Sequence, residues 1–399
     1  MAMEQKVFTA VADPGPLAVS DRLRRFVLGI TTVGFVLFLL GLALNAQRAW
    51  AAFLVNYFFF LSIGVGGIFF AALHYVSGAF WSTPVRRLAE GFAAYLPIAA
   101  ALLLALLAGL GQLYGWTDHD RFHFGPSKAA YLSTPFFMGR LLFYLGLWML
   151  FGWLIIGNSV RQDRLRDPEL TRRNARLSAA FLVLFGITFY LASVDLLMSL
   201  EPTWFSTMFG VYTFAGLFLS TMATLALITL TVRRHTALGE IIQDFHVRDI
   251  GTWLMAFSCF MMYIGFSQFM LIWYANLPLE AFFMIKRTEN GWQYLLAALP
   301  VLKWVLPFIV LMPDAFRGHP KVLRAVAVGV LLGQWLDLFW IVYPSFYEHP
   351  VVPTWIELGT FLGFAGLFGL ALLNFYGRFS MLAVGDPKLL YSLNGGYLK

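Results

Sequence analysis

Ten long apolar runs follow one another along this chain, and they leave little choice of fold. A helix needs roughly 20 residues to cross a hydrocarbon core of about 30 Å, and each run is long enough to do so. The runs lack the period-two alternation of barrel strands, so helices are the only spanning structures that fit. We place the runs at residues 26–44, 50–77, 92–113, 135–156, 177–200, 203–232, 250–275, 292–312, 322–343 and 354–376.

The composition leads to the same fold class. Of the 399 residues, 60% are hydrophobic and only 12% are charged, which predicts an all-α integral membrane protein. A formal net charge of +7 would suggest nucleic acid in a soluble protein, but here the basic residues fall in short segments between the runs. We therefore expect membrane lipids and no nucleic acid as partners. The most basic segment, residues 161–176, is predicted to be a loop that attracts anionic lipid.

The distribution of basic residues predicts the orientation. Two of the 28 Lys and Arg, Arg140 and Lys303, lie within runs, and most of the others fall on the side of the N-terminus. The other side has only Arg48, Arg121, Lys128, Lys286 and Arg287. Because basic loops stay inside, we predict a multi-pass protein with both termini cytoplasmic, including an N-terminal segment at 1–25 and a tail at 378–399.

Two charged couples are the most unusual feature inside the runs. A carboxylate costs roughly 2.5–3.5 kcal/mol at the centre of a membrane helix, so Asp195 is expected to face a partner rather than lipid. The nearest suitable cation in sequence is Arg140, on the preceding run. Lys303 and Asp337 repeat this arrangement on two later runs, and a proline follows each aspartate by seven positions.

This repetition predicts a single membrane domain, residues 26–377, with two related halves. Four helices separate the couples, and an even number implies a parallel repeat about an axis along the membrane normal. We expect two four-helix bundles, at about residues 50–200 and 203–343. The helices at 26–44 and 354–376 would flank them.

The predicted orientation gives each buried polar residue a depth. Helix directions place Arg140, Asp195, Asp337 and Glu357 toward the outer face, with Lys303 near the midplane and obliged to extend its stem outward. Two interpretations remain open: the ion pairs only hold helices together, or they are steps of a proton path. The candidates for such a path are His74, Arg140, Tyr144, Asp195, Lys303, Gln334, Asp337 and Glu357.

Redox groups have few candidate ligands here. The single cysteine, Cys259, excludes a thiolate-bound iron–sulfur cluster and the Cys-x-x-Cys-His attachment of a c-type haem. Among the seven histidines only His74 is clearly inside a run, so we expect no haem held by two histidines and no metal site. The segment 118–123 has metal-binding residue types, but its spacing favours a solvated loop. Tyr263 and Gln268 could hold a quinone headgroup or belong to the interfacial aromatic belt.

Several stretches together resemble a known family. They are HYVSGAFWSTPVRR (74–87), KAAYLS (128–133) leading to Arg140, SLEPTWFSTMFG (199–210), QFMLIWYAN (268–276) with Glu280, and WLDL (335–338). In combination they resemble the ActF membrane subunits of bacterial alternative complex III, which are similar to the NrfD and PsrC membrane subunits of quinone-linked enzymes.

The resemblance implies a function that residue patterns alone do not. It implies a subunit of a quinol:electron-acceptor (cytochrome c) oxidoreductase in the bacterial inner membrane. The implied partners are a sister NrfD-like subunit that oxidises quinol, an iron–sulfur protein and c-type cytochromes, and these would hold the iron–sulfur clusters and haems. This chain would bind no redox centre and would provide a proton route.

Three other interpretations remain. The chain could itself bind quinol near Tyr263, Gln268 and Asp337. It could be an autonomous secondary transporter, since parallel repeats and midplane ion pairs occur in that class too. It could also be a scaffold in which the ion pairs do nothing but hold helices.

Overall fold

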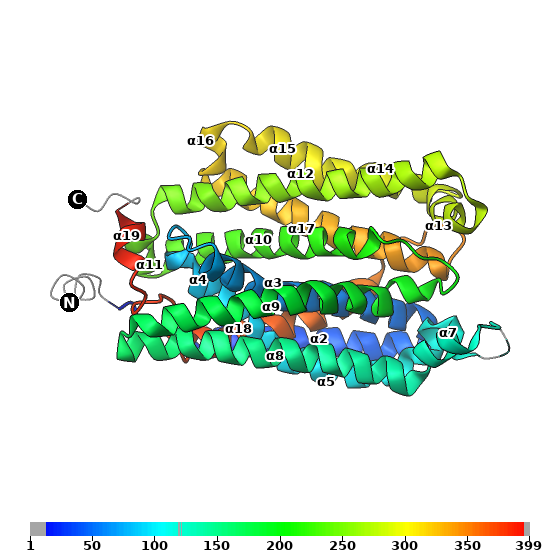
Figure 1. The fold of residues 1–399 in the computed structure, drawn as a ribbon, viewed down its shortest axis with the longest axis horizontal. Helices are drawn as coiled ribbons and strands as arrows, with labels where there is room; N and C mark the ends of the chain where they lie inside the picture. The colour runs from blue at the N-terminus through cyan, green and yellow to red at the C-terminus, as the bar shows by residue number, and fades with distance from the viewer. Residues whose placement is uncertain (1–12, 119, 121, 395–399) are drawn as a thin grey trace.

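The computed structural model describes residues 13–118, 120 and 122–394, and over this range the chain is helical without a β-strand. As predicted, it is an all-α membrane protein with ten helical spans that are long and apolar enough to cross a bilayer (Figure 1). The spans are α2 (Asp21–Leu44), α3 (Ala46–Val76), Thr83–Leu113 (α4 to α6), α8 (Thr134–Leu165), Pro168–Leu200 (α9 and η4), α10 (Phe209–His235), α12 (Asp244–Ala275), Trp292–Leu311 (α14, η5 and α15), Pro320–Ser345 (α17 and η6) and α18 (Trp355–Tyr376).

Several helices continue beyond the apolar runs, because a polar turn outside the lipid can still make helical hydrogen bonds. The clearest case is the basic segment 161–176, where the predicted loop is wrong. There α8 extends to Leu165 and α9 begins at Pro168, so the break is only two residues long. Arg166 adopts a left-handed conformation with φ of 50°, and Asp167 caps α9 by accepting a hydrogen bond from the Glu169 amide.

The spans form two four-helix groups. In the first bundle α3, the third span, α8 and α9 pack in a ring, and in the second bundle α10, α12, the eighth span and α17 do the same. The central pair is α3 and α10, whose most apolar windows are 94% and 83% buried. Across the boundary α9 packs on α10 and α17 packs on α3, which is the reciprocal contact of a parallel two-fold repeat (Figure 1).

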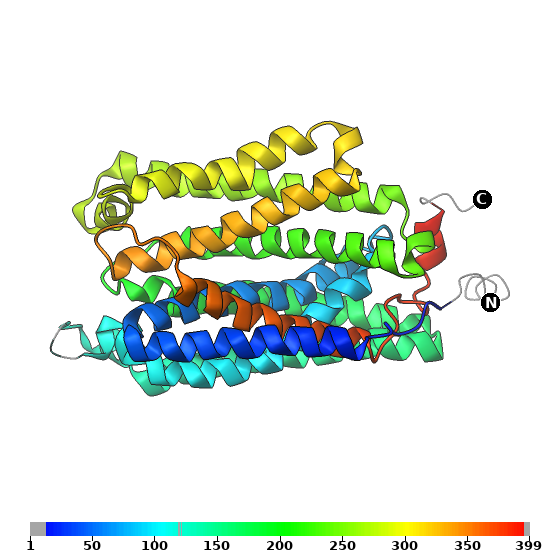
Figure 2. The ribbon, with the colours of Figure 1, turned by 180° about the vertical axis from the view of Figure 1, so that it is seen from behind.

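The first and last spans do not lie symmetrically on the two bundles. Their most extensive contact is with each other, and α18 also packs on α3 and on the 3₁₀ turn of the third span, η1 (Gly91–Tyr95). Both therefore cover the first bundle, as the view from behind shows (Figure 2). The second bundle keeps more of its lateral surface free of other helices of this chain.

The described ends of the chain meet at one end of the molecule, which we call the terminal face. The Leu17 amide donates to the Tyr376 carbonyl at 2.8 Å, and Ser380 donates to Asp13 at 2.6 Å. The short helices α7 (Pro126–Tyr131) and α13 (Pro278–Thr288) lie at the other end, the opposite face (Figure 1). Which face is cytoplasmic stays a prediction from the basic residues.

The segment after α18 packs onto the bundles instead of leaving them. Met381 and Leu382 are buried, and the short helix α19 (Leu389–Leu393) packs on α4 (Thr83–Glu90). The region predicted as a tail is thus, from Arg378 to Asn394, a folded cover over part of the terminal face.

Candidate functional site

The first predicted couple forms a two-pronged ion pair between α8 and α9. Arg140 Nη2 donates to Asp195 Oδ1 at 2.8 Å, and Nε donates to Oδ2 at 3.1 Å. Asp195 is fully buried, and only 10% of the Arg140 side chain is exposed. The pair is therefore shielded from lipid, near the opposite-face ends of its helices.

Residues of the opposite face cover this pair. Arg140 Nη1 donates to the Tyr131 carbonyl at 2.7 Å, and the guanidinium lies 3.6 Å from the Tyr131 ring centroid. Burial, together with the nearby Asp195 charge, raises the pKa of Tyr131, which stays protonated. Tyr144, one turn along α8, is buried beside the pair. Each of the three guanidinium nitrogens of Arg140 thus donates to an oxygen in a fixed position, two on Asp195 and one on the Tyr131 backbone. This geometry holds the arginine and the aspartate rigidly together, as a clamp does.

The second predicted couple is built differently. Lys303 Nζ lies 3.0 Å from Asp337 Oδ2, and Tyr212 on α10 donates to Asp337 Oδ1 at 2.5 Å. Lys303 Nζ also donates to Gln334 Oε1 at 3.4 Å. No group in the described part of the chain donates a well-aligned hydrogen bond to Oδ2, so this oxygen keeps acceptor capacity. The Asp337 carboxylate is therefore buried, and one of its two oxygens can still accept a hydrogen bond.

An irregular stretch of the eighth span carries the lysine to this position. Between Pro300 and Pro307 the backbone forms a π-helical turn, η5 (Val301–Val305), with Lys303 at its centre. Such turns are rare and occur frequently at functional sites. Gly333 on α17 allows the lysine stem to cross, since a β-carbon there would lie 2.8 Å from Lys303 Cγ. The Lys303 side chain therefore reaches Asp337, as expected from the sequence, because the eighth span widens at this turn and Gly333 on α17 leaves room for the side chain.

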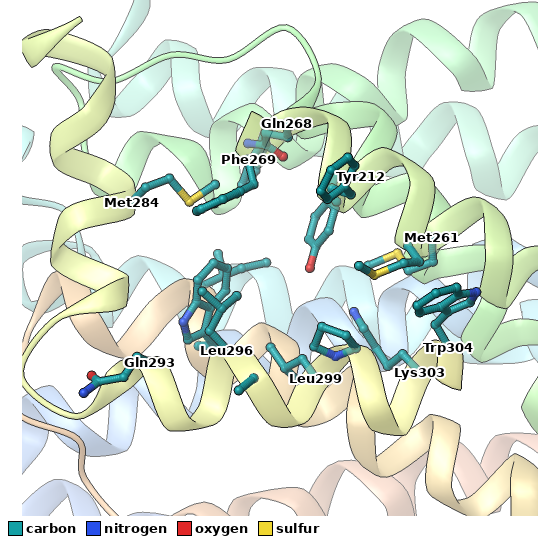
Figure 3. A pocket seen from close by; sticks show the side chains of 18 of the residues that line it. Tyr212, Met261, Gln268, Phe269, Met284, Gln293, Leu296, Leu299, Lys303 and Trp304 are labelled. Carbon is teal, nitrogen blue, oxygen red and sulfur yellow. The ribbon is translucent and has the colours of Figure 1, made fainter. Parts of the chain in front are cut away.

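Lys303 faces a cavity of about 350 Å³ in the second bundle, in the half nearer the opposite face. Figure 3 shows Lys303 and Tyr212 pointing into it from two sides, with Gln268 and Phe269 on a third. The rest of the lining is mainly methionine and aromatic, and Phe266 and Phe269, which are 53% and 38% exposed, bring it to the lateral surface. A buried cation therefore adjoins an apolar cavity that opens sideways.

A row of small and polar residues continues from this site along α10. Gly216, one turn after Tyr212, lies against Gln334, because a β-carbon there would be 2.5 Å from Gln334 Nε2. Ser220 and Thr224 follow at the same spacing and are buried. At 1.5 Å per residue the row extends about 18 Å toward the terminal face. Both hydroxyls donate to carbonyls of their own helix, so their lone pairs remain available as acceptors.

The remaining predicted residues lie apart from the two couples. His74 is buried at the terminal-face end of α3, where Nδ1 is 2.7 Å from the Phe70 carbonyl and Nε2 has no described partner. Glu357 binds Arg48, accepts from Tyr343 at 2.8 Å and caps its own helix through Thr354, which gives it a structural role.

The two residues suggested for a quinone headgroup separate in the structure. Gln268 is 5% exposed and lines the cavity, whereas Tyr263 is 66% exposed on the outer side of α12 and does not line it. The two side chains do not share a site.

Sequence reasoning missed a buried charge cluster at the terminal face. Arg87 Nη1 donates to Asp163 at 2.8 Å and Nε lies 2.9 Å from Glu90, while Arg86 forms a short ion pair with Asp386 of the C-terminal cover. From the sequence, the two arginines count among the basic residues that give the orientation and close the stretch 74–87, and neither observation predicts their burial. The spacing of Glu90, three and four residues after them, was the available signal.

No metal-binding group was found among the described residues. No three His, Cys, Asp or Glu side chains of that part of the chain lie close enough to hold an ion. His119 and Arg121 of the segment 118–123 fall outside the described residues.

Comparison with known proteins adds no identity. No protein-family model matches the chain, and no curated protein matches it.

Proposed function

We propose that the chain is the ActF-like membrane subunit of an alternative complex III, a quinol:cytochrome c oxidoreductase of the bacterial inner membrane, and that it provides a proton route. The buried Lys303–Asp337 pair beside a cavity supports the proton route, and the sequence stretches that resemble ActF subunits support membership of the complex. Quinol, iron–sulfur clusters and c-type haems would be bound by partner subunits: a sister NrfD-like subunit, an iron–sulfur protein and c-type cytochromes. The termini would be cytoplasmic.

The two couples are assigned different roles. An arginine does not release its proton in proteins, and Arg140 holds Asp195 at both oxygens, so this pair positions α8 against α9. A buried lysine shifts its pKa readily and can give up its proton. Lys303 can pass a proton to Asp337 Oδ2, which leaves a neutral amine beside a neutral acid and conserves the total charge. The second pair is therefore the proton-exchanging one.

The route to the other face would follow α10. From Asp337 and Gln334 it would pass Ser220 and Thr224, with water bridging steps of about 6 Å. His74 is the candidate group at the terminal-face end, because its Nε2 is buried without a described partner. Glu357 is left out of the route, since its oxygens are occupied by Arg48, Tyr343 and Thr354.

Membership of the complex is tested by gentle purification from native membranes. The tagged full-length chain is expected to co-purify with an iron–sulfur protein and with haem-bearing c-type cytochromes, identified by mass spectrometry and haem staining. Isolation of the chain alone, with quinol oxidation intact in the membranes that remain, would argue against the complex.

The proton role is tested in the assembled complex by replacing each aspartate with its amide. Asp337→Asn is expected to lower proton release per electron while subunit composition and haem content stay normal. Asp195→Asn is the matched control, because it changes the other couple in the same way and is expected to affect stability more than proton release. If proton release is unchanged in Asp337→Asn, the ion pairs are a scaffold only.

One observation supports a second candidate, a quinol site within this chain. The cavity combines the Lys303 cation and the amides of Gln268 and Gln293 with an apolar, laterally open wall, which is the usual make-up of a site for a small amphiphile. Gln268→Leu removes the buried one of these two amides with little change in volume, and it is expected to lower quinol oxidation with assembly intact if quinol binds here. Tyr263→Phe is the control, since that residue lies outside the cavity. Equal quinol oxidation in both variants would leave the sister subunit as the site of oxidation.

A further inference from the structure

A second cavity, of about 530 Å³, lies in the first bundle at the terminal-face end. Its walls are formed by η1 and α5 (Leu96–Leu106) of the third span, by α8, by Phe375 in the last turn of α18 and by Phe379 just after that helix. Its volume is within the range of roughly 300–1,000 Å³ that is usual for ligand sites. Neither the Arg140–Asp195 pair nor the Lys303–Asp337 pair lines it.

The cavity exists because small residues face each other across two helices. Ala93 and Ala94 line it on one side and Gly157 on the other, and a β-carbon at Gly157 would meet nothing within 4 Å. Trp153 lines the same cavity and is 73% exposed, so the opening is lateral, toward the surrounding lipid.

Charge is concentrated at one end of this cavity. Two exposed arginines line it near the terminal face, Arg161 at the end of α8 and Arg173 at the start of α9. Neither forms an ion pair with an acidic side chain of the described residues. Of the nearby carboxylates, Asp163 pairs with Arg87, Glu169 pairs with Arg172 and Arg176, and Asp167 accepts a hydrogen bond from the Glu169 amide.

The relative position of the two arginines is fixed by a buried amide pair. Asn158 Nδ2 donates to Asn174 Oδ1 at 2.9 Å, and Asn174 Nδ2 donates to the Ile155 carbonyl at 3.0 Å. Both asparagines are at most 5% exposed. The hydrogen bond between them joins α8 to α9 within one helical turn of Arg161 and of Arg173. The backbone positions of the two arginines at the mouth of the cavity are therefore fixed before a ligand binds.

The distribution of polarity matches one leaflet of a bilayer. From Arg161 down α8 to Met149, the lining extends over 13 residues, which is about 18 Å of helix. Half of a hydrocarbon core is about 15 Å. The two arginines make the terminal-face end of the cavity cationic, where lipid headgroups would lie. The rest of the cavity, lined by Trp153 and Phe375 among others, is apolar over about the length of one acyl chain.

We propose that this cavity binds an anionic diacyl phospholipid, with its phosphate between Arg161 and Arg173 and one acyl chain in the space left by Gly157, Ala93 and Ala94. Guanidinium groups bind phosphate oxygens through paired hydrogen bonds, and basic pockets between helices on the cytoplasmic side bind such headgroups. The inference does not rest on the proposed proton route, and it requires only the full chain in a membrane.

The test measures lipid binding to the purified full-length chain by native mass spectrometry, with phosphatidylglycerol and phosphatidylcholine of identical acyl chains as probes. The wild-type chain is expected to prefer phosphatidylglycerol. Replacing both Arg161 and Arg173 by Gln is expected to weaken phosphatidylglycerol binding roughly 30-fold with little effect on phosphatidylcholine. The matched control, Arg164→Gln with Arg234→Gln, removes the same charge at the same face outside the cavity and is expected to keep the preference.

A variant that changes shape and not charge separates this site from a general attraction to the basic face. Gly157→Phe fills the cavity, and it is expected to reduce binding of both lipids at this site while both arginines remain. If that variant does not fold, salt gives the second measurement: raising it from about 0.05 M to about 0.5 M is expected to remove the preference in the wild type.

Three outcomes would overturn the proposal. They are equal binding of the two lipids by the wild type, equal loss of preference in the arginine variant and its control, and cross-linking of a photoreactive amino acid in place of Trp153 to a polypeptide instead of a lipid in native membranes.

Discussion

Tyr212 on α10 donates a 2.5 Å hydrogen bond to one oxygen of Asp337 on α17, while Lys303 lies 3.0 Å from the other oxygen. The carboxylate is thus held by a neutral donor on one side and by a cation on the other. This arrangement fixes the orientation of Asp337, and it leaves one oxygen free to exchange a proton with the lysine or with water from the cavity.

The first prediction concerns this tyrosine. Tyr212→Phe keeps the ring and removes the hydroxyl, so it is expected to lower the free energy of unfolding by roughly 1.5–3 kcal/mol, the usual contribution of a hydrogen bond to a charged group. Thermal unfolding of the purified chain in detergent measures it. Tyr263→Phe is the control, because that residue is 66% exposed, and its unfolding should match the wild type. Equal effects in both variants would contradict a special role for Tyr212.

The second prediction follows from treating the first couple as a clamp. Asp195→Leu alone leaves the Arg140 guanidinium, of whose side chain only 10% is exposed, without its carboxylate, and it is expected to cost roughly 3–5 kcal/mol. Adding Arg140→Leu removes the stranded charge, so the double variant should recover most of the lost stability. Its proton release per electron in the assembled complex should stay close to that of the wild type. A double variant no more stable than the single one would show that the two residues act independently.

The second couple should respond differently to the same design, which is the third prediction. Lys303→Met with Asp337→Leu also removes both charges, and stability should again recover relative to Asp337→Leu alone. Proton release should nevertheless be lost, because neither the methionine nor the leucine that replaces the charged pair can bind a proton. The comparison of the two double variants separates the clamp from the proton-exchanging pair, and retention of proton release in both would favour a scaffold for both.

The sequence identified the two couples because charged residues in apolar runs are costly and conspicuous. Arg140 and Asp195 lie on consecutive spans at the same depth, so their meeting followed from topology alone. The contact of Lys303 with Asp337 needed a π-helical turn, and the only hint of it was the pair of prolines on either side. The all-helical fold was predicted from the length of the runs.

Tyr212 was missed for a different reason. In the sequence it is a tyrosine in an apolar run, as Tyr263 is, and a single aromatic residue does not reveal which face of its helix packs inward. Its role depends on the packing of α10 against α17, which only the three-dimensional structure supplies. The cavity was missed likewise, since it is a property of four helices together and of no single run.

The buried cluster of Arg86 and Arg87 shows a third limit, because one of its ion pairs joins residues 300 positions apart. Asp386 reaches Arg86 only when the segment after α18 folds back over the terminal face.

This contact gives the fourth prediction. Asp386→Ala leaves Arg86, which is 2% exposed, without that carboxylate and is expected to destabilise the chain by roughly 3–5 kcal/mol. Asp314→Ala is the control: it breaks the pairs of this 60% exposed carboxylate with Arg248 and Arg317, and surface pairs of this kind contribute about 0–1 kcal/mol each. Thermal unfolding and the rate of protease cleavage after Arg378 measure both variants. Cleavage should accelerate in Asp386→Ala alone, because the cover loses its ionic attachment to α4, and equal cleavage rates would mean that the apolar contacts of Met381 and Leu382 suffice to hold it.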